Sequence, residues 1–209
     1  MSGAVDRYAV IGNPIAHSLS PEIHARFARE CGQSLTYERL LAPVDGFVAA
    51  VSAFREAGGR GLNVTVPFKR EAAALADRPS ERVRQAGAAN TLGFDADGIW
   101  ADNTDGLGLV ADLQGRLGIA LAGARIVLLG AGGAARGVVG PLLATDVERL
   151  VVVARRPDQA TELVAGFRDS RLASGGFDGL ARLRVDIAIN ATSAGLSDAG
   201  LPIPDAFWP

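Results

Sequence analysis

The sequence predicts an α/β protein of two domains, and three observations lead to this fold class. Apolar, strand-like segments alternate with helix-like segments along the chain, as in proteins built on parallel sheets. The 26 glycines lie at the joints between these segments and form no low-complexity tract. The alternation starts afresh after Gly118, where a glycine-rich turn follows an apolar strand. We therefore expect an N-terminal α/β domain over residues 1–105 and a second α/β domain over residues 106–209.

The helices of the first domain are predicted from capping residues and apolar spacing. Ser20 is expected as the N-cap of the first helix, with Pro21 at the first helical position and Gly32 beyond the end. Apolar residues at helical spacing predict a second helix, and Pro67 breaks the chain before a third. These two helices are marked by Phe47, Val51 and Phe54, and by the range Phe68–Ala76.

Short apolar runs predict the strands of the first domain. The expected strands are Tyr8–Gly12, Leu35–Leu41, Leu62–Val66, Ala89–Phe94 and Ile99–Ala101. An Asp-Gly pair between the last two strands predicts a hairpin. Since helices separate the first three strands, we expect those three to pair in parallel.

The second domain repeats the alternation. A helix over Asp105–Leu117 should precede it. The elements then expected are strand Arg125–Leu129, a helix ending near Ala144, strand Leu150–Ala154, helix Pro157–Phe167 and strand Val185–Asn190. These elements form a β-α-β unit with one more helix and strand.

The composition is that of a folded chain with a small molecule as its partner. The 209 residues suffice for one large or two small domains, and 48% of them are hydrophobic against 21% charged. These fractions exclude an intrinsically disordered chain. The formal net charge is −2, with basic and acidic residues interspersed, so we expect no nucleic-acid partner and no anionic membrane surface.

Neither a membrane span nor a metal site is expected. The longest stretch without Asp, Glu, Lys or Arg runs over 14 residues, from Tyr8 to Pro21, whereas a membrane helix needs about 20 apolar residues. The N-terminus lacks the basic and apolar regions of a secretory signal, so we expect a cytoplasmic protein. No Cys/His cluster has metal-ligand spacing, and the single Cys31 is expected to be a buried structural thiol.

The glycine-rich turn predicts a dinucleotide-binding domain of the Rossmann type. Residues 130–135 read Gly-Ala-Gly-Gly-Ala-Ala between a strand and a helix, which fits G-x-G-x-x-A. Gly130 permits the tight turn, Gly132 lets the backbone approach a pyrophosphate, and Ala135 lets the helix pack closely on the strand. The N–H groups at the helix start would face the phosphates. The alternative is a tight strand-to-helix turn without a ligand.

The end of the next strand favours NADP over NAD. NAD sites carry a carboxylate at this position, about 20 residues after the glycines, to accept hydrogen bonds from the ribose 2′-hydroxyl. Here the strand ends in Ala154, Arg155 and Arg156. Two guanidinium groups would donate to a 2′-phosphate. The alternative is a solvated arginine pair that opens the next helix.

Polar residues at strand ends predict a hydroxylated ligand for the first domain. Hydroxyls and amides both donate and accept hydrogen bonds, and the carboxyl ends of parallel strands meet at one sheet edge. This pattern favours a sugar-like acid over a flat apolar molecule. The candidate residues are Ser18, Ser20, Asn63, Thr65, Lys69, Asn90 and Asp105.

Lys69 is the only lysine among 21 basic residues, and it lies just after a strand at the start of a helix. An amine can lose its proton, whereas a guanidinium effectively cannot. We therefore predict that Lys69 acts in general acid–base catalysis. The alternative is chance, because a bias toward arginine codons would also leave one lysine over.

Six motifs together resemble the shikimate dehydrogenase family. They are residues 11–21 (IGNPIAHSLSP), 63–69 (NVTVPFK), 87–92 (GAANTL), 103–106 (NTDG), 130–134 (GAGGA) and 190–195 (NATSAG). The resemblance implies NADP-dependent, reversible reduction of 3-dehydroshikimate to shikimate, in chorismate and aromatic amino-acid biosynthesis. It leaves the oligomeric state open, a homodimer included.

The resemblance also implies a role for each matched residue. Ser18 and Ser20 would bind the substrate carboxylate, and Asn63, Thr65, Asn90 and Asp105 would surround its ring hydroxyls. Lys69 would be the proton donor and acceptor, with Asp105 as its catalytic partner. The cofactor would be held by Gly130, Ala131, Gly132, Gly133, Ala134, Ala154, Arg155, Arg156, Thr192 and Ser193.

Two departures from the family keep other interpretations open. Only Arg155 matches the family's Asn-Arg-Thr segment, and Gln159 stands where an arginine often follows, which weakens the expected affinity for a 2′-phosphate. A quinate/shikimate dehydrogenase that uses NAD is one alternative, although the lack of a carboxylate near Ala154 argues against it. Family members run to about 270 residues, as two ordinary domains would. This sequence ends at Pro209, so we expect a C-terminally incomplete second domain. A non-catalytic fragment that binds shikimate and NADP is the other alternative.

Overall fold

The computed structural model describes residues 5–192, 203 and 207, which divide into two compact units, Met1–Asn103 and Thr104–Pro209. Unit 1 has a mixed sheet of order β2-β1-β3-β5-β6-β4. Its strands are β1 (Asp6–Gly12), β2 (Leu35–Leu41), β3 (Gly59–Val64), β4 (Arg78–Pro79), β5 (Thr91–Asp95) and β6 (Gly98–Asp102). Its helices are α1 (Ser20–Glu30), α2 (Phe47–Glu56), α3 (Lys69–Leu75) and α4 (Glu81–Ala86).

The strand pairing of unit 1 follows the predicted repeats. β1 pairs in parallel with β2 and with β3, which confirms the parallel core of this sheet. β5 runs antiparallel to β3 and forms the predicted hairpin with β6. At the hairpin turn Gly98 has a φ of 113°, a conformation that side chains with a Cβ rarely adopt.

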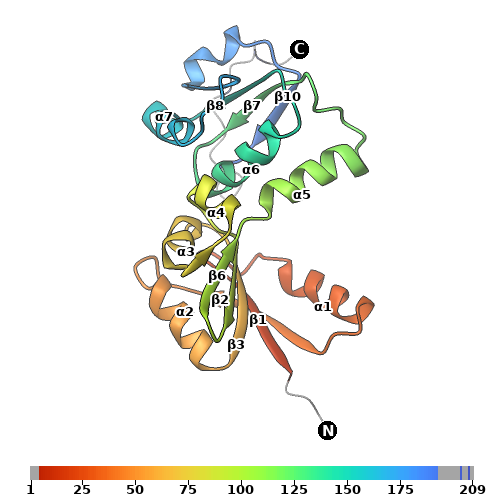
Figure 1. The fold of residues 1–209 in the computed structure, drawn as a ribbon, viewed down its shortest axis with the longest axis vertical. Helices are drawn as coiled ribbons and strands as arrows, with labels where there is room; N and C mark the ends of the chain where they lie inside the picture. The colour runs from red at the N-terminus through yellow and green to blue at the C-terminus, as the bar shows by residue number, and fades with distance from the viewer. Residues whose placement is uncertain (1–4, 193–202, 204–206, 208–209) are drawn as a thin grey trace. The chain divides into compact units, whose positions relative to one another are not determined.

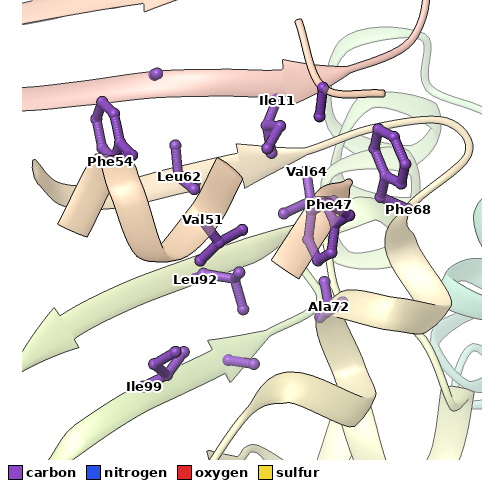
Figure 2. Close-up of a cluster of buried hydrophobic side chains, with 14 of the residues drawn as sticks. Ile11, Phe47, Val51, Phe54, Leu62, Val64, Phe68, Ala72, Leu92 and Ile99 are labelled. Carbon is purple, nitrogen blue, oxygen red and sulfur yellow. The ribbon is translucent and has the colours of Figure 1, made fainter. Parts of the chain in front are cut away.

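The two faces of this sheet differ because side chains alternate along each strand. One face packs against α2 and α3, where Phe47, Val51 and Phe68 meet Ile11 and Leu62 in a buried apolar cluster (Figure 2). The opposite face lies under α1 (Figure 1). This second face carries polar side chains, namely Tyr37, Arg39, Asn63, Thr91 and Asp102.

The first helix begins one residue earlier than its capping signal predicts. Leu19 is the N-cap of α1 and Ser20 is the first helical residue, so the prediction of Ser20 as N-cap is wrong. Ser18 provides the polar side chain at the helix start, because its Oγ accepts a hydrogen bond from the Ser20 N–H at 3.3 Å. Gly32 ends the helix with a φ of 63°, as predicted.

Other differences in unit 1 arise where apolar patterning is weak. β3 begins at Gly59 and stops at Val64, because the chain turns there and Phe68 N–H donates to Thr65 C=O at 3.0 Å. The sequence did not predict β4 or α4. Cys31 is exposed, so the prediction of a buried thiol is wrong.

Unit 2 contains a fully parallel sheet of order β10-β7-β8-β9. Its strands are β7 (Arg125–Leu129), β8 (Arg149–Val153), β9 (Leu172–Gly175) and β10 (Ile187–Asn190). Its helices are α5 (Asp105–Ala111) with a π-helical turn (Asp112–Arg116), α6 (Gly133–Leu143), α7 (Pro157–Ala165) and a 3₁₀ segment (Phe177–Arg182). The predicted bounds of β7 are confirmed, whereas β9 was not predicted.

In unit 2 the helix α5, which precedes the first strand β7, packs closely against α6. A Cβ on Gly106 of α5 would lie 2.6 Å from the Gly137 carbonyl oxygen and 2.5 Å from Pro141 of α6. Only a glycine permits this approach. Among the described residues, no helix combines the length and the apolar character needed to cross a bilayer.

Candidate active site

In unit 1 the predicted substrate residues lie around the carboxyl ends of β1 and β3. The chain leaves β1 at Gly12 and β3 at Val64, and backbone hydrogen bonds join the two exits. Asn13 N–H donates to Val66 C=O at 2.9 Å, and Thr65 N–H donates to Ile11 C=O at 3.0 Å. This arrangement brings the segment with Thr65 beside the loop that leads to Ser18.

Ser18 and Ser20 form a small hydroxyl pair at the start of α1. The Ser18 hydroxyl donates to Ser20 Oγ at 3.2 Å. Arg39 of β2 fixes this loop, because its Nε donates to the Ser18 carbonyl oxygen at 2.8 Å and its Nη2 pairs with Glu22 at 2.8 Å. The sequence analysis did not find Arg39. Arg39 lies two residues after Tyr37 in β2, so the two side chains lie on the same face of the sheet. The alternation of side chains along a strand could have identified this arginine from the sequence.

Asn63 and Asn90 meet across the β3–β5 edge. Val64 N–H donates to the Asn90 carbonyl oxygen at 2.7 Å, and Asn63 Nδ2 lies 3.4 Å from the same oxygen and from Thr91 Oγ1. Asn90 Oδ1 accepts from the Thr91 hydroxyl at 2.9 Å. Both carboxamides are half-buried, so each keeps part of its polar surface available to a ligand.

Lys69 opens α3 immediately beyond this edge. Its backbone carbonyl oxygen accepts from Ala89 N–H at 2.8 Å, which places the helix start beside Asn90. The lysine is half-buried. Asp105 begins α5 in unit 2, so the structure brings Lys69 together with the asparagine segment, and the predicted pairing of Lys69 with Asp105 stays a prediction.

Asp102, at the end of β6, forms hydrogen bonds with several neighbouring residues of this region. Its carboxylate accepts hydrogen bonds from Ser80 Oγ at 2.7 Å, Asn103 N–H at 2.7 Å and Arg82 Nε at 3.0 Å, and its backbone carbonyl accepts from Asn90 N–H at 3.1 Å. Burial raises the pKa of Asp102, but the hydrogen bonds from Arg82, Ser80 and Asn103 outweigh it and leave this pKa below its ordinary value.

Replacing Asp102 with asparagine is expected to lower the free energy of unfolding by about 1–3 kcal/mol at pH 7, as for other hydrogen bonds to charged groups. A carboxyl with a lowered folded-state pKa stabilises the fold above about pH 4 and loses that effect as the pH falls through its folded pKa. Urea unfolding at pH 7 and pH 3 should therefore show a gap between wild type and Asp102→Asn that narrows in acid. Asp97→Asn, in the exposed hairpin turn, serves as the control, and a gap independent of pH would contradict the assignment.

In unit 2 the predicted cofactor residues follow the carboxyl ends of three neighbouring strands. Gly130 N–H donates to Val153 C=O at 2.7 Å, and Ala191 N–H donates to Leu129 C=O at 2.8 Å. The glycine turn after β7, the arginine pair after β8 and Thr192 after β10 therefore share one sheet edge. Thr192 is held there by Asn190, whose Oδ1 accepts from the Thr192 hydroxyl at 2.7 Å. Ser193 lies outside the described residues.

The glycine turn has the shape of a phosphate cradle. Gly130 has a φ of 110°, and a Cβ there would lie 2.9 Å from the Ala191 carbonyl oxygen. Gly132 is the N-cap of α6 and is exposed, and an added Cβ there would meet no atom of the described residues within 4 Å beyond its chain neighbours and the helix's own backbone. Open space over the first N–H groups of a helix, which have no intrahelical acceptor, suits an anionic diphosphate. Ala131, Gly133 and Ala134 complete the turn around that space.

Arg155 and Arg156 lie at the start of α7, with Ala154 buried behind them. Both arginines are exposed. A pair of cations at a helix N-terminus is disfavoured by the helix dipole, so an anion bound there would relieve it. Arg136, in the first turn of α6, ties that helix to α7 because its Nη2 donates to Glu162 at 2.8 Å. The donor set therefore fits a dinucleotide with an additional phosphate.

The described residues contain no group of three or more His, Cys, Asp or Glu side chains that could hold a metal ion. Apart from the Asp102 carboxylate, which is paired with Arg82, the polar groups gathered at the two sheet edges are hydroxyls, carboxamides, one lysine and arginines. These groups bind carboxylates, hydroxyls and phosphates.

Comparison with known proteins finds matches for both units of the chain. Residues 10–92 match the model of the shikimate dehydrogenase substrate binding domain, and residues 113–197 match that of shikimate / quinate 5-dehydrogenase. A shikimate dehydrogenase (NADP(+)) from Aromatoleum aromaticum is 54% identical over 208 residues, covering 98% of this chain and 75% of the relative. The corresponding protein from Halorhodospira halophila is 55% identical over 201 residues, covering 96% of this chain and 74% of the relative.

A solved structure extends the similarity to three dimensions. Shikimate 5-dehydrogenase from Thermus thermophilus, in complex with NADP(H) and shikimate, superposes with a TM-score of 0.85 at 32% identity, covering 98% of this chain and 76% of that one. The sequence motifs, the fold and the relatives agree from the first strand of unit 1 to the last strand of unit 2. The chain belongs to the shikimate dehydrogenase family.

Proposed function

We propose that this chain catalyses the NADP-dependent, reversible reduction of 3-dehydroshikimate to shikimate. It is an oxidoreductase of a family whose members at 50–55% identity are named shikimate dehydrogenase (NADP(+)). One observation carries the proposal for this chain's own residues. The segments bearing Ser18, Asn63, Lys69 and Asn90 are hydrogen-bonded into one polar edge of the unit 1 sheet. In aromatic amino-acid biosynthesis this reaction leads toward chorismate.

The substrate residues divide by the chemistry of the groups that they meet. The Ser20 hydroxyl donates to the substrate carboxylate, and the Ser18 hydroxyl, which donates to Ser20 Oγ in this structure, turns to the same carboxylate when the substrate binds. Arg39 holds their loop in place. Asn63, Thr65 and Asn90 offer mixed donors and acceptors to the ring hydroxyls. The half-buried position of these side chains supports this assignment, because partial desolvation strengthens each hydrogen bond to a ligand.

Lys69 transfers the proton to and from the substrate oxygen. In the direction of reduction, bound NADPH supplies a hydride to the ketone carbon, and the Lys69 ammonium gives a proton to the ketone oxygen. In oxidation the Lys69 amine takes that proton back from the shikimate hydroxyl. Asp105 orients the Lys69 amine and accepts from a ring hydroxyl. The glycine turn and the arginine pair hold the phosphates of the cofactor.

The direct test is a spectrophotometric assay of this chain with shikimate or quinate and with NADP+ or NAD+. We expect absorbance of the reduced cofactor at 340 nm with shikimate and NADP+. A higher kcat/KM with NAD+ or with quinate would favour the alternative of an NAD-using quinate/shikimate dehydrogenase. Calorimetric binding of shikimate and NADP+ without turnover would favour the alternative of a non-catalytic binding fragment.

Replacing Arg155 and Arg156 together with alanine is expected to raise KM for NADP+ by about 10- to 100-fold, the usual cost of charge-assisted hydrogen bonds to phosphate. KM for NAD+ should change by less than about threefold, because NAD+ has no 2′-phosphate. Arg168→Ala, another exposed arginine of unit 2, is the matched control. An equal rise in both KM values would show that the pair supports the fold and not the 2′-phosphate.

The cytoplasmic location stays a prediction, and the oligomeric state, a homodimer included, is still open. Light scattering of the purified chain measures its mass in solution, and fractionation of cells measures its location.

A further inference from the structure

We propose that Tyr37 is a positioning residue for substrate binding, whose hydroxyl holds the Asn63 carboxamide in place. The inference rests on the proposed function, since it assumes that Asn63 contacts shikimate. Tyr37 lies on β2, between the predicted motifs, and no motif of the sequence contains it. It is half-buried on the polar face of the unit 1 sheet.

The Tyr37 hydroxyl makes a short hydrogen bond across two strands of the sheet. It donates to Asn63 Oδ1 at 2.6 Å. A phenol has one proton, so this bond commits that proton to the Asn63 carboxamide.

The bond from Tyr37 is the shortest hydrogen bond of the Asn63 carboxamide. The Asn90 carbonyl oxygen can only accept, so it determines that Nδ2 faces it. However, Nδ2 lies 3.4 Å from this oxygen and from Thr91 Oγ1, longer than the roughly 2.9 Å of an ordinary N–H···O bond. The 2.6 Å bond from Tyr37 to Oδ1 therefore does most to hold the carboxamide in place. Without it the carboxamide keeps only its two long contacts and is held less firmly toward the substrate.

The tyrosine ring is itself held in place. The imidazole of His24, on α1, stacks on it with ring centroids 4.1 Å apart and an interplanar angle of 6°. Burial lowers the pKa of His24, and its hydrogen bond with Asn63 only partly opposes this, so the neutral imidazole is favoured against the ring. Burial also raises the pKa of Tyr37, which keeps the phenol protonated as a donor. The stacked His24 ring thus supports Tyr37.

The test is Tyr37→Phe, which removes the hydroxyl and keeps the stacked ring. KM for shikimate should rise about tenfold, the effect of one good hydrogen bond, while KM for NADP+ stays within about twofold and kcat within about threefold. His24→Leu, which removes the support and keeps the hydroxyl, should show the same pattern with a smaller rise. In an Asn63→Ala background the effect of Tyr37→Phe should shrink, because the two residues act together.

Tyr8→Phe is the matched control. Tyr8 and Tyr37 are the chain's two tyrosines, and they lie opposite each other in the β1–β2 register. Tyr8→Phe should leave every kinetic constant unchanged. Shikimate binding is measured by calorimetry alongside the assays, and thermal unfolding is measured for each variant.

The outcomes separate this inference from the proposed function. A wild-type chain that neither binds nor oxidises shikimate would overturn both. A working wild-type chain with an unchanged KM for shikimate in Tyr37→Phe would overturn the inference alone. So would a Tyr37→Phe variant whose KM values for shikimate and NADP+ rise together, since a merely structural role predicts that. If Tyr37→Phe does not fold, His24→Leu decides by the same criteria.

Discussion

Replacing Lys69 with methionine is expected to lower kcat for shikimate oxidation by about a thousandfold, within the range for loss of a general acid–base group. Methionine keeps an unbranched side chain but can neither hold nor release a proton at this position. The hydroxyl proton of shikimate then has no acceptor as the hydride leaves. Stopped-flow and steady-state measurement of NADPH formation check this, and calorimetry should find the Kd for shikimate changed by less than about tenfold.

Lys69→Arg distinguishes proton transfer from charge. Arginine restores the positive charge but stays protonated at any accessible pH, so this variant should be nearly as slow as Lys69→Met. Arg70→Met, at the next and exposed position of α3, controls for changes to the helix start. A Lys69→Arg variant with kcat near wild type would show that Lys69 acts through its charge.

The single lysine also permits a chemical test on the unaltered chain. Lys69 and the α-amino group are the only amines of the chain, because the other 20 of its 21 lysine and arginine residues are arginines, so these are the two amino groups that an acylating reagent can modify. Peptide mass spectrometry separates the two products. Shikimate should slow acylation of Lys69 and leave that of the α-amino group unchanged.

The sequence predicts best those elements whose burial is complete on both sides. β7 has buried side chains on both faces of its sheet, with Leu128 in one apolar cluster and Leu129 in another. The result is an unbroken apolar run that predicts the strand without ambiguity. β9 was missed because Leu172 is its one buried apolar residue, and its pairing with β8 comes from the sheet and not from its own pattern.

The residues of the candidate site also differ in how well the sequence predicts them. Motif residues such as Ser18, Asn63 and Gly130 were found because each stands at the end of a predicted strand or helix. Tyr37 and His24 were missed because their roles depend on contacts between β2, α1 and β3, which have no signature in any one segment. For Cys31 the sequence analysis made the opposite mistake, because it predicted burial that the structure does not have. A thiol near the end of an amphipathic helix can face the core or the solvent, and Cys31 is exposed.

The two glycines of the cofactor turn should respond differently to the same substitution. In Gly130→Ala the new Cβ would meet the Ala191 carbonyl oxygen at 2.9 Å, at a φ of 110°. Such a residue carries a strain of about 1–3 kcal/mol, so the melting temperature and the affinity for NADP+ should fall together. In Gly132→Ala the φ is −79° and the space around the Cβ is open, so the melting temperature should stay unchanged.

Gly132→Ala nonetheless should raise KM for NADP+ by about 100-fold or more, because its methyl group occupies the space where a pyrophosphate approaches the backbone. KM for shikimate should not change in either variant that remains folded. Gly115→Ala, with similarly open surroundings in the π-helical turn, controls for the substitution itself. If Gly132→Ala binds NADP+ as well as wild type does, the pyrophosphate does not lie on this turn, whereas equal losses of stability in both variants would mean that the two glycines serve the fold alone. Only a cofactor held on the turn explains a variant that folds normally, binds shikimate normally and loses NADP+.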